Sequence, residues 1–243
     1  MRRSHRVGAR RPGAGAPPLG VLGGMGPLAT ARFYEALVRA TPAHSDQEHI
    51  RTVIWSDPAI PDRTAAIVDG GPSPVPAMIA GAQRLRRMGA ELLVTPCNTA
   101  HHFLPVVARA ARMRTIDMID ATMAQASKAG AARVGILATR GTRAARLYDA
   151  AGVRYGVRTI YPDVATQHRF VDRAISLVKQ ADDRALAGRL LSGAGATLCG
   201  AGADLLITAC TELPLVSGDL ARATTVIDSV DCLAAACVSA LRC

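Results

Sequence analysis

Two cysteines stand at corresponding places in the two halves of the chain, each shortly after an apolar run typical of a buried strand. Cys97 lies in the segment 92–101 (LLVTPCNTAH), and Cys210 lies in the segment 205–212 (LLITACTE). In open α/β sheets, ligands bind at the carboxyl ends of the strands, where a following helix also presents free N–H groups. The two copies of this arrangement predict one site built from two facing cysteines.

Two opposed thiols suit the transfer of a proton from one face of a carbon atom to the other. A thiolate on one side removes the proton, while a thiol on the opposite side supplies another. The pKa of a cysteine can be brought near neutrality, and the positive end of a helix dipole favours the thiolate. We therefore take Cys97 and Cys210 as candidate acid and base groups.

An internal repeat supports this interpretation. The segment 20–26 (GVLGGMG) corresponds to 135–141 (GILATRG), 115 positions later, and Cys97 corresponds to Cys210, 113 positions later. Two separate landmarks at nearly one offset predict two pseudo-symmetric α/β halves. If the halves face each other, the cysteines meet across a cleft between them.

Strand and helix patterns alternate along the chain, which predicts a mostly parallel sheet flanked by helices in each half. The predicted strands are 19–22, 52–55, 92–94, 115–118, one in 133–142 with its turn, 157–161, 205–208 and 226–228. The predicted helices include 27–40, 164–180, 182–200 and 230–241, with shorter ones after 64 and before 88, 111 and 130.

The composition and the absence of long apolar runs argue against a membrane protein or an exported protein. The chain has 243 residues, is 49% hydrophobic and carries a formal net charge of +10. No apolar run approaches the roughly 18 residues that span a bilayer, and no signal-peptide core is seen, so we expect no membrane partner and a cytoplasmic location.

Half of the net charge lies in the segment 1–18, which is rich in Gly, Ala and Pro and has no acidic residue. We expect this basic tail to be disordered; the alternatives are a nucleic-acid arm or a transit peptide. The tail has no aromatic residue for base stacking and no helical periodicity, so we expect no nucleic-acid partner. Its charges come from Arg2, Arg3, Arg6, Arg10 and Arg11.

The cysteine and histidine spacings do not predict a metal site. None of the six cysteines forms a C-x-x-C pair or a zinc-ligand spacing, so reduced thiols are expected. His101 and His102 are adjacent and would point about 100° apart on a helix, so they would not both face one metal ion. We expect His101 to support the cysteine loop and His102 to lie on the surface. The remaining cysteines are expected to be small buried residues or terminal surface thiols, namely Cys199, Cys232, Cys237 and Cys243.

Six separated segments resemble the cofactor-independent aspartate racemases of the aspartate/glutamate racemase superfamily. They are 23–30 (GGMGPLAT), 46–49 (DQEH), 60–64 (IPDRT), 96–101 (PCNTAH), 137–139 (LAT) and 210–212 (CTE). The resemblance implies two domains with the active site between them and a C-terminal helix that returns to the first. This gives a first domain of 19–118 plus 225–243 and a second of 119–224. It also implies a homodimer that uses neither pyridoxal phosphate nor a metal.

The same resemblance implies roles for ten residues. Cys97 and Cys210 would be the acid/base pair, and Arg63 and Lys179 would clamp the distal carboxylate of aspartate. A planar guanidinium group can bind a carboxylate with two parallel hydrogen bonds, which agrees with this role for Arg63. Glu212, next to Cys210, is expected to tune that thiol or to orient the substrate amine; the alternative is a carboxylate at a helix start, where the helix dipole favours it. The other residues expected to contact the substrate are Met25, Asn98, Thr99, Thr139 and Thr211.

Other functions remain open at this point. The segment 24–29 (GMGPLA) satisfies the dinucleotide pattern G-x-G-x-x-A, but the acidic residue Asp57 comes 28 positions after Ala29 and is late for a ribose contact. We therefore expect racemisation of L- and D-aspartate. The alternatives are a racemase of glutamate or another acidic amino acid, a dicarboxylate-binding protein without activity, a single-thiol decarboxylase and a dinucleotide-dependent oxidoreductase.

Overall fold

The two halves of the chain form two parallel sheets with the same strand order. The computed structural model describes residues 17–180 and 182–242. The first sheet has the order β2-β1-β3-β4 and the second the order β6-β5-β7-β8, all pairs being parallel. This equivalence confirms the predicted α/β class and the internal repeat. The strands are β1 (Leu19–Gly23), β2 (Thr52–Ser56), β3 (Leu92–Val94), β4 (Arg114–Thr115), β5 (Arg133–Ala138), β6 (Arg158–Ile160), β7 (Leu205–Ala209) and β8 (Val226–Asp228).

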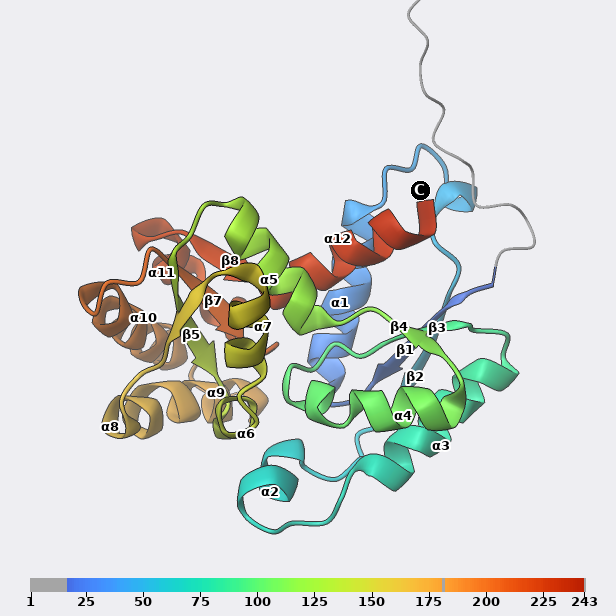
Figure 1. Cartoon of the computed structure of the whole chain (residues 1–243), viewed down its shortest axis with the longest axis horizontal. Coiled ribbons are helices and arrows are strands. Elements are labelled where there is room, and N and C mark those ends of the chain that lie inside the picture. Colours follow the sequence, from blue (N-terminus) through green and yellow to red (C-terminus); the bar gives the residue numbers. More distant parts are fainter. Residues whose placement is uncertain (1–16, 181, 243) are drawn as a thin grey trace, which may run out of the picture.

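Helices connect successive strands and cover both faces of each sheet (Figure 1). Those of the first half are α1 (Pro27–Ala40), α2 (Arg63–Val68), α3 (Val75–Arg87) and α4 (Leu104–Ala111). They are followed by α5 (Met118–Lys128), α6 (Arg140–Ala144), α7 (Leu147–Tyr155), α8 (Val164–Thr166), α9 (Arg173–Lys179), α10 (Arg184–Gly200), α11 (Gly218–Ala223) and α12 (Ser229–Arg242). Short 3-10 turns occur at Asp46–Glu48, Thr99–His102 and Leu213–Val216, and a π-helical turn at Gln167–Asp172.

The central strands are apolar on both sides because helices cover both sides. All five residues of β1 and of β7 are buried, as expected for parallel strands inside an α/β sheet. In β1, Leu22 packs into a core with α3 and α4, whereas Val21 packs into a core with α1 and α12. In β5, Ile136 and Leu137 divide in the same way between the two cores of the second sheet. Each such side chain contributes about 1.5–3 kcal/mol when fully buried.

The C-terminal helix crosses from the second sheet to the first half. The strand β8 pairs with β7 of the second sheet, and α12 then runs beside α1 (Figure 1). In that position Val230 and Leu233 share a core with Phe33 of α1. The predicted first domain included 225–243, but within this segment residues 226–228 belong to the second sheet and only the helix returns.

Two predicted elements differ from the observed ones. The strand predicted at 115–118 ends at Thr115, because the Asp117 side chain accepts hydrogen bonds from the N–H groups of Ile119 and Asp120 and so begins α5. The helix predicted at 164–180 is interrupted by the π-helical turn, where Gln167 turns inward to donate to the Ala138 carbonyl.

The sequence predicted no membrane-spanning segment and a disordered basic tail. None of the helices within the described residues is long and apolar enough to cross a membrane. Residues 1–16, which form most of the predicted disordered tail, lie outside the described residues.

The turn after β1 requires glycine, which gives a stability prediction. Gly24 has φ +90°, and a Cβ there would lie 2.3 Å from backbone atoms of Asp57. Gly24→Ala should therefore lower the free energy of unfolding by about 3 kcal/mol or more, from the left-handed conformation and the backbone clash together. Gly130→Ala is the matched control, because Gly130 has φ +77° but nothing within 4 Å of its Cβ position. Urea unfolding should show a loss of only about 1 kcal/mol for this control; equal losses would contradict the clash.

Candidate active site

A narrow cavity lies between the two halves, at the carboxyl ends of the central strands. It is lined by all ten predicted site residues, and by Asp62 and Thr64 in addition. The two additional residues flank Arg63 in the segment 60–64, so the same motif could have indicated them. In this conformation the cavity leaves about 20 Å³ for the centre of a water molecule, which is room for about one water. The predicted residues that it contains are Met25, Arg63, Cys97, Asn98, Thr99, Thr139, Lys179, Cys210, Thr211 and Glu212.

His101 supports the loop that carries Cys97. The Met118 N–H donates to Nε2 of His101 at 3.0 Å, so Nδ1 carries the proton and donates to the Cys97 carbonyl at 2.9 Å. Both ring nitrogens are thus used within the protein, and His102 lies on the surface. Neither histidine is placed to bind a metal, and no group of metal-binding side chains occurs in the described part of the chain.

Cys210 is held in the thiol form by its surroundings. Its side chain is buried, and Sγ donates to Oε2 of the buried Glu212 at 3.1 Å. Burial raises the pKa of Cys210 well above its ordinary value, the negative charge of Glu212 raises it further, and Lys179 opposes both effects. At neutral pH Cys210 is therefore a proton donor.

The two cations of the cavity are engaged differently. Arg63 donates to the carbonyls of Ile60 and Pro61, at 3.1 and 3.0 Å, and to that of Met25 at 3.3 Å. It therefore joins the start of α2 to the glycine-rich turn. Lys179 forms no ion pair within 4 Å among the described residues.

The pKa values of Lys179 and Asp62 are shifted by burial and by the charged groups around them. Burial lowers the pKa of Lys179, but Cys210, Glu212, Cys97 and Asp62 together outweigh this and raise it. Burial acts to raise the pKa of Asp62, but the Ala65 N–H and the charges of Arg63 and Lys179 lower it overall. Lys179 is thus a charged ammonium group in the same cavity as the two cysteines.

Three hydroxyl groups join the halves at the edge of the cavity. Oγ1 of Thr99 lies 2.9 Å from Oγ1 of both Thr139 and Thr142, and the latter two lie 3.1 Å apart. Thr142, which the motifs did not indicate, also donates its N–H to Thr139, which caps α6. A Cβ on Gly141 would lie 2.9 Å from Cα of Thr64 and from Cγ2 of Thr99, so glycine is required for this close approach.

Asn98, Met25 and Thr211 complete the lining. The Asn98 side chain bonds to Tyr148 and Ser229, two residues that sequence reasoning missed because they lie 50 and 131 positions away. Met25 is 3% exposed, and the Thr211 hydroxyl lies 3.3 Å from Oε2 of Glu212. Thus most polar groups of the lining are already oriented by the protein.

An open hollow of about 310 Å³ adjoins the cavity and shares Asp62, Thr64, Thr139 and Lys179 with it. Across this hollow, Arg140 lies 3.5 Å from Asp69, at the C-cap of α2, and 3.7 Å from Asp172, in the π-helical turn. The arginine therefore links the first half to the second beside the cavity.

The glycine-rich turn does not suit a dinucleotide. The missing side chain of Gly24 allows the backbone of Asp57 to approach, rather than a pyrophosphate. A Cβ on Gly26 would lie 3.4 Å from Oε1 of Glu212, so the turn packs against this side chain. The glycines of the pattern serve the packing of this site.

The chain is similar to amino-acid racemases over most of its length. Residues 22–237 match the family described as Asp/Glu/Hydantoin racemase. The Picrophilus torridus aspartate racemase structure is 32% identical, with a TM-score of 0.81 over 92% of this chain and 94% of that one. The broad specificity amino-acid racemase RacX of Bacillus subtilis (strain 168) is 26% identical over 91% of this chain and 96% of that protein. The glutamate racemase isoform RacE1 from Bacillus anthracis shares the fold, at 20% identity and a TM-score of 0.68 over 93% of this chain and 81% of that one.

Replacing Glu212 by Gln should lower the pKa of Cys210, because the negative charge that raises it is removed. The pH midpoint of the ultraviolet absorbance of the Cys210 thiolate, taken as the difference from a Cys210→Ala protein, should move to lower pH. Glu91→Gln, which removes an exposed carboxylate outside the cavity, is the control and should leave the midpoint in place. An unchanged midpoint in Glu212→Gln would show that burial alone sets this pKa.

Proposed function

The chain belongs to the Asp/Glu/Hydantoin racemase family, and from this premise we propose that it interconverts L- and D-aspartate. One of the two cysteines, Cys97 and Cys210, removes the α-proton, and the other supplies a proton to the opposite face of the carbon. The observation that carries the proposal is the position of both cysteines in one cavity between the two halves, together with two cations. The mechanism uses only side chains of this chain.

In the proposed reaction, the Cys97 thiolate removes the α-proton from one face of the substrate, so that the C–H bond breaks and an S–H bond forms. Cys210 then gives its thiol proton to the opposite face of the carbanion, which inverts the configuration. The raised pKa of Cys210 supports its role as the acid in this direction. The other enantiomer reacts with the form of the enzyme in which the two protonation states are exchanged.

The hydroxyl groups of the cavity would bind the α-carboxylate and stabilise the charge that develops beside it. Thr99, Thr139 and Thr211 line the cavity, and each is positioned by a neighbour, either a second hydroxyl or Glu212. Each hydroxyl has a single proton, so binding of the carboxylate would turn that proton from its present partner to the substrate. Glu212 also carries the negative charge that a substrate ammonium group requires.

The second carboxylate of aspartate would bind chiefly to Lys179. Its ammonium group has no ion pair within the described residues, whereas Arg63 already donates to three backbone carbonyls. The 32% identity to an aspartate racemase supports the same substrate. The similarity to the broad specificity enzyme RacX makes racemisation of a wider range of amino acids the second candidate.

The proposal is tested by proton NMR of L-aspartate in D₂O, followed by chiral analysis. The protein should remove the α-proton signal and form D-aspartate, while Cys97→Ala and Cys210→Ala should each lower racemisation by at least about 10³-fold, because each supplies an essential proton transfer. Cys237→Ala is the control, because Cys237 is buried in the core with α1, outside the cavity. Racemisation that survives in either cavity variant would contradict the two-cysteine mechanism.

Lys179→Met should raise KM for aspartate by about tenfold or more, because a charge-assisted bond to the distal carboxylate is lost. The rate with a neutral amino acid, if one is accepted, should change much less. Lys128→Met is the matched control, since Lys128 is the other lysine of the chain and is exposed on α5. Unchanged aspartate kinetics in Lys179→Met would remove this residue from substrate recognition.

A further inference from the structure

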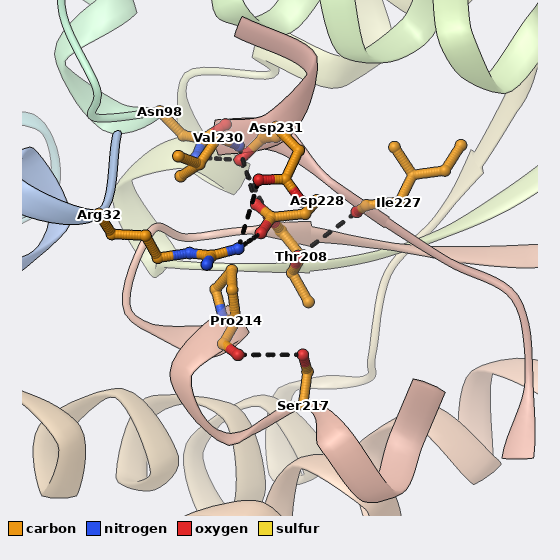
Figure 2. A network of polar contacts seen from close by, with 10 residues as sticks. Arg32, Asn98, Thr208, Pro214, Ser217, Ile227, Asp228, Val230 and Asp231 are labelled. Atoms are coloured by element: carbon orange, nitrogen blue, oxygen red, sulfur yellow. Dashed lines mark hydrogen bonds and ion pairs between the residues drawn. The ribbon is translucent and has the colours of Figure 1, made fainter. Parts of the chain in front are cut away.

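A chain of buried hydrogen bonds runs from the residue next to Cys97 to the strand that leads to Cys210. The Tyr148 hydroxyl lies 2.7 Å from Oδ1 of Asn98, and Nδ2 of Asn98 lies 3.0 Å from Oγ of Ser229. Oγ of Ser229 in turn lies 3.0 Å from the carbonyl oxygen of Thr208, two residues before Cys210. Figure 2 shows two members of this arrangement, Asn98 and Thr208, beside the start of α12.

The Thr208 carbonyl determines the donor and the acceptor in each of these hydrogen bonds. The Thr208 carbonyl can only accept, so the single hydroxyl proton of Ser229 points to it. Ser229 must then accept from Asn98, which places the amide NH₂ toward Ser229 and the amide oxygen toward Tyr148. Tyr148 must therefore donate. Only one arrangement of the amide satisfies all these groups.

The chain has little freedom because it is buried throughout. Tyr148, Thr208 and Ser229 are 0% exposed and Asn98 is 2% exposed. A buried polar group that loses its partner costs about 1–3 kcal/mol, so each member is held by the next. Asn98 belongs to the first half, whereas Tyr148 lies on α7 and Thr208 on β7 of the second.

Asp228, the residue before Ser229, forms an ion pair with α1, a second element of the first half. Asp228 pairs with Arg32 of α1, and Arg32 also lies 3.5 Å from Asp231 (Figure 2). The junction between β8 and α12 thus contacts both α1 and the Cys97 loop. It is the place where the second sheet is attached to the first half next to the cavity.

We propose that Tyr148 and Ser229 are positioning residues that, through Asn98, fix the Cys97 loop relative to the strand of Cys210. The inference rests on the proposed racemase function. Their effect is to keep the two thiols on opposite faces of one α-carbon, where a displacement of about 1 Å can cost roughly 100-fold in rate.

Loss of this alignment should separate two reactions that the intact site couples. A thiolate that has removed the α-proton can exchange it with D₂O and return deuterium to the same face. Delivery from the opposite face requires the second thiol at the correct distance. Misalignment should therefore slow inversion more than exchange with retention of configuration.

The experiment measures both rates for Ser229→Ala and Tyr148→Phe in D₂O, by α-proton NMR and chiral analysis of the same samples. We expect inversion to fall by about 10- to 100-fold and the ratio of retained exchange to inversion to rise several-fold. Ser217→Ala and Tyr34→Phe are the controls. Ser217 donates to the Pro214 carbonyl and takes no part in the hydrogen bonds that join Tyr148, Asn98, Ser229 and Thr208, as Figure 2 shows. Tyr34 is exposed on α1.

A variant that is only less well folded would lose both reactions in parallel, so an unchanged ratio in both variants overturns the inference. If Ser229→Ala does not fold, Tyr148→Phe, which keeps the ring, and Ser229→Thr, which keeps the hydroxyl, decide the question. Ser229→Thr should keep a ratio near that of the wild type. A wild-type protein that neither exchanges nor inverts any amino acid overturns the proposed function and the inference together.

Discussion

The close contact between the two halves is the constraint on which the site depends. The reaction that we propose uses one thiol from each half, and Cys97 and Cys210 share one cavity because the two sheets meet at their carboxyl ends. Beside the cavity, small residues and hydrogen-bonding side chains contribute to this contact. Gly141 lets the start of α6 approach Thr64 and Thr99, and the hydroxyls of Thr99, Thr139 and Thr142 lie within about 3 Å of one another.

Charge within the cavity is balanced by groups that oppose one another. Burial and the Glu212 carboxylate keep Cys210 protonated, while Lys179 favours the thiolate. The pKa of Lys179 is raised in return by the negative groups around it. The dicarboxylate substrate that we propose, with its one ammonium group, would find both a cation and an anion already in place in this cavity.

Much of the fold and of the site could be predicted from the sequence. Local patterns determined the alternation of strands and helices, and the offset between Cys97 and Cys210 predicted the repeat that the two sheets confirm. All ten predicted site residues line one cavity: most follow strands at the carboxyl ends of the two sheets, whereas Arg63 belongs to α2 and Lys179 to α9. The predicted helix 164–180 is helical to Lys179, but the π-helical turn within it was not predicted; there Gln167 bonds to the distant carbonyl of Ala138.

Only the tertiary structure decided how these residues are held. Tyr148 and Ser229 carry no motif, and their role follows from contacts across 50 and 131 positions. The return of the C-terminal helix to the first half was implied by the resemblance, but the contacts that hold α12 on α1, the core around Phe33 and the pairing of Arg32 with Asp228, are seen only in the structure. Sequence patterns report the environment of a residue along its own strand or helix, whereas hydrogen bonds between distant elements exist only after the halves have packed together.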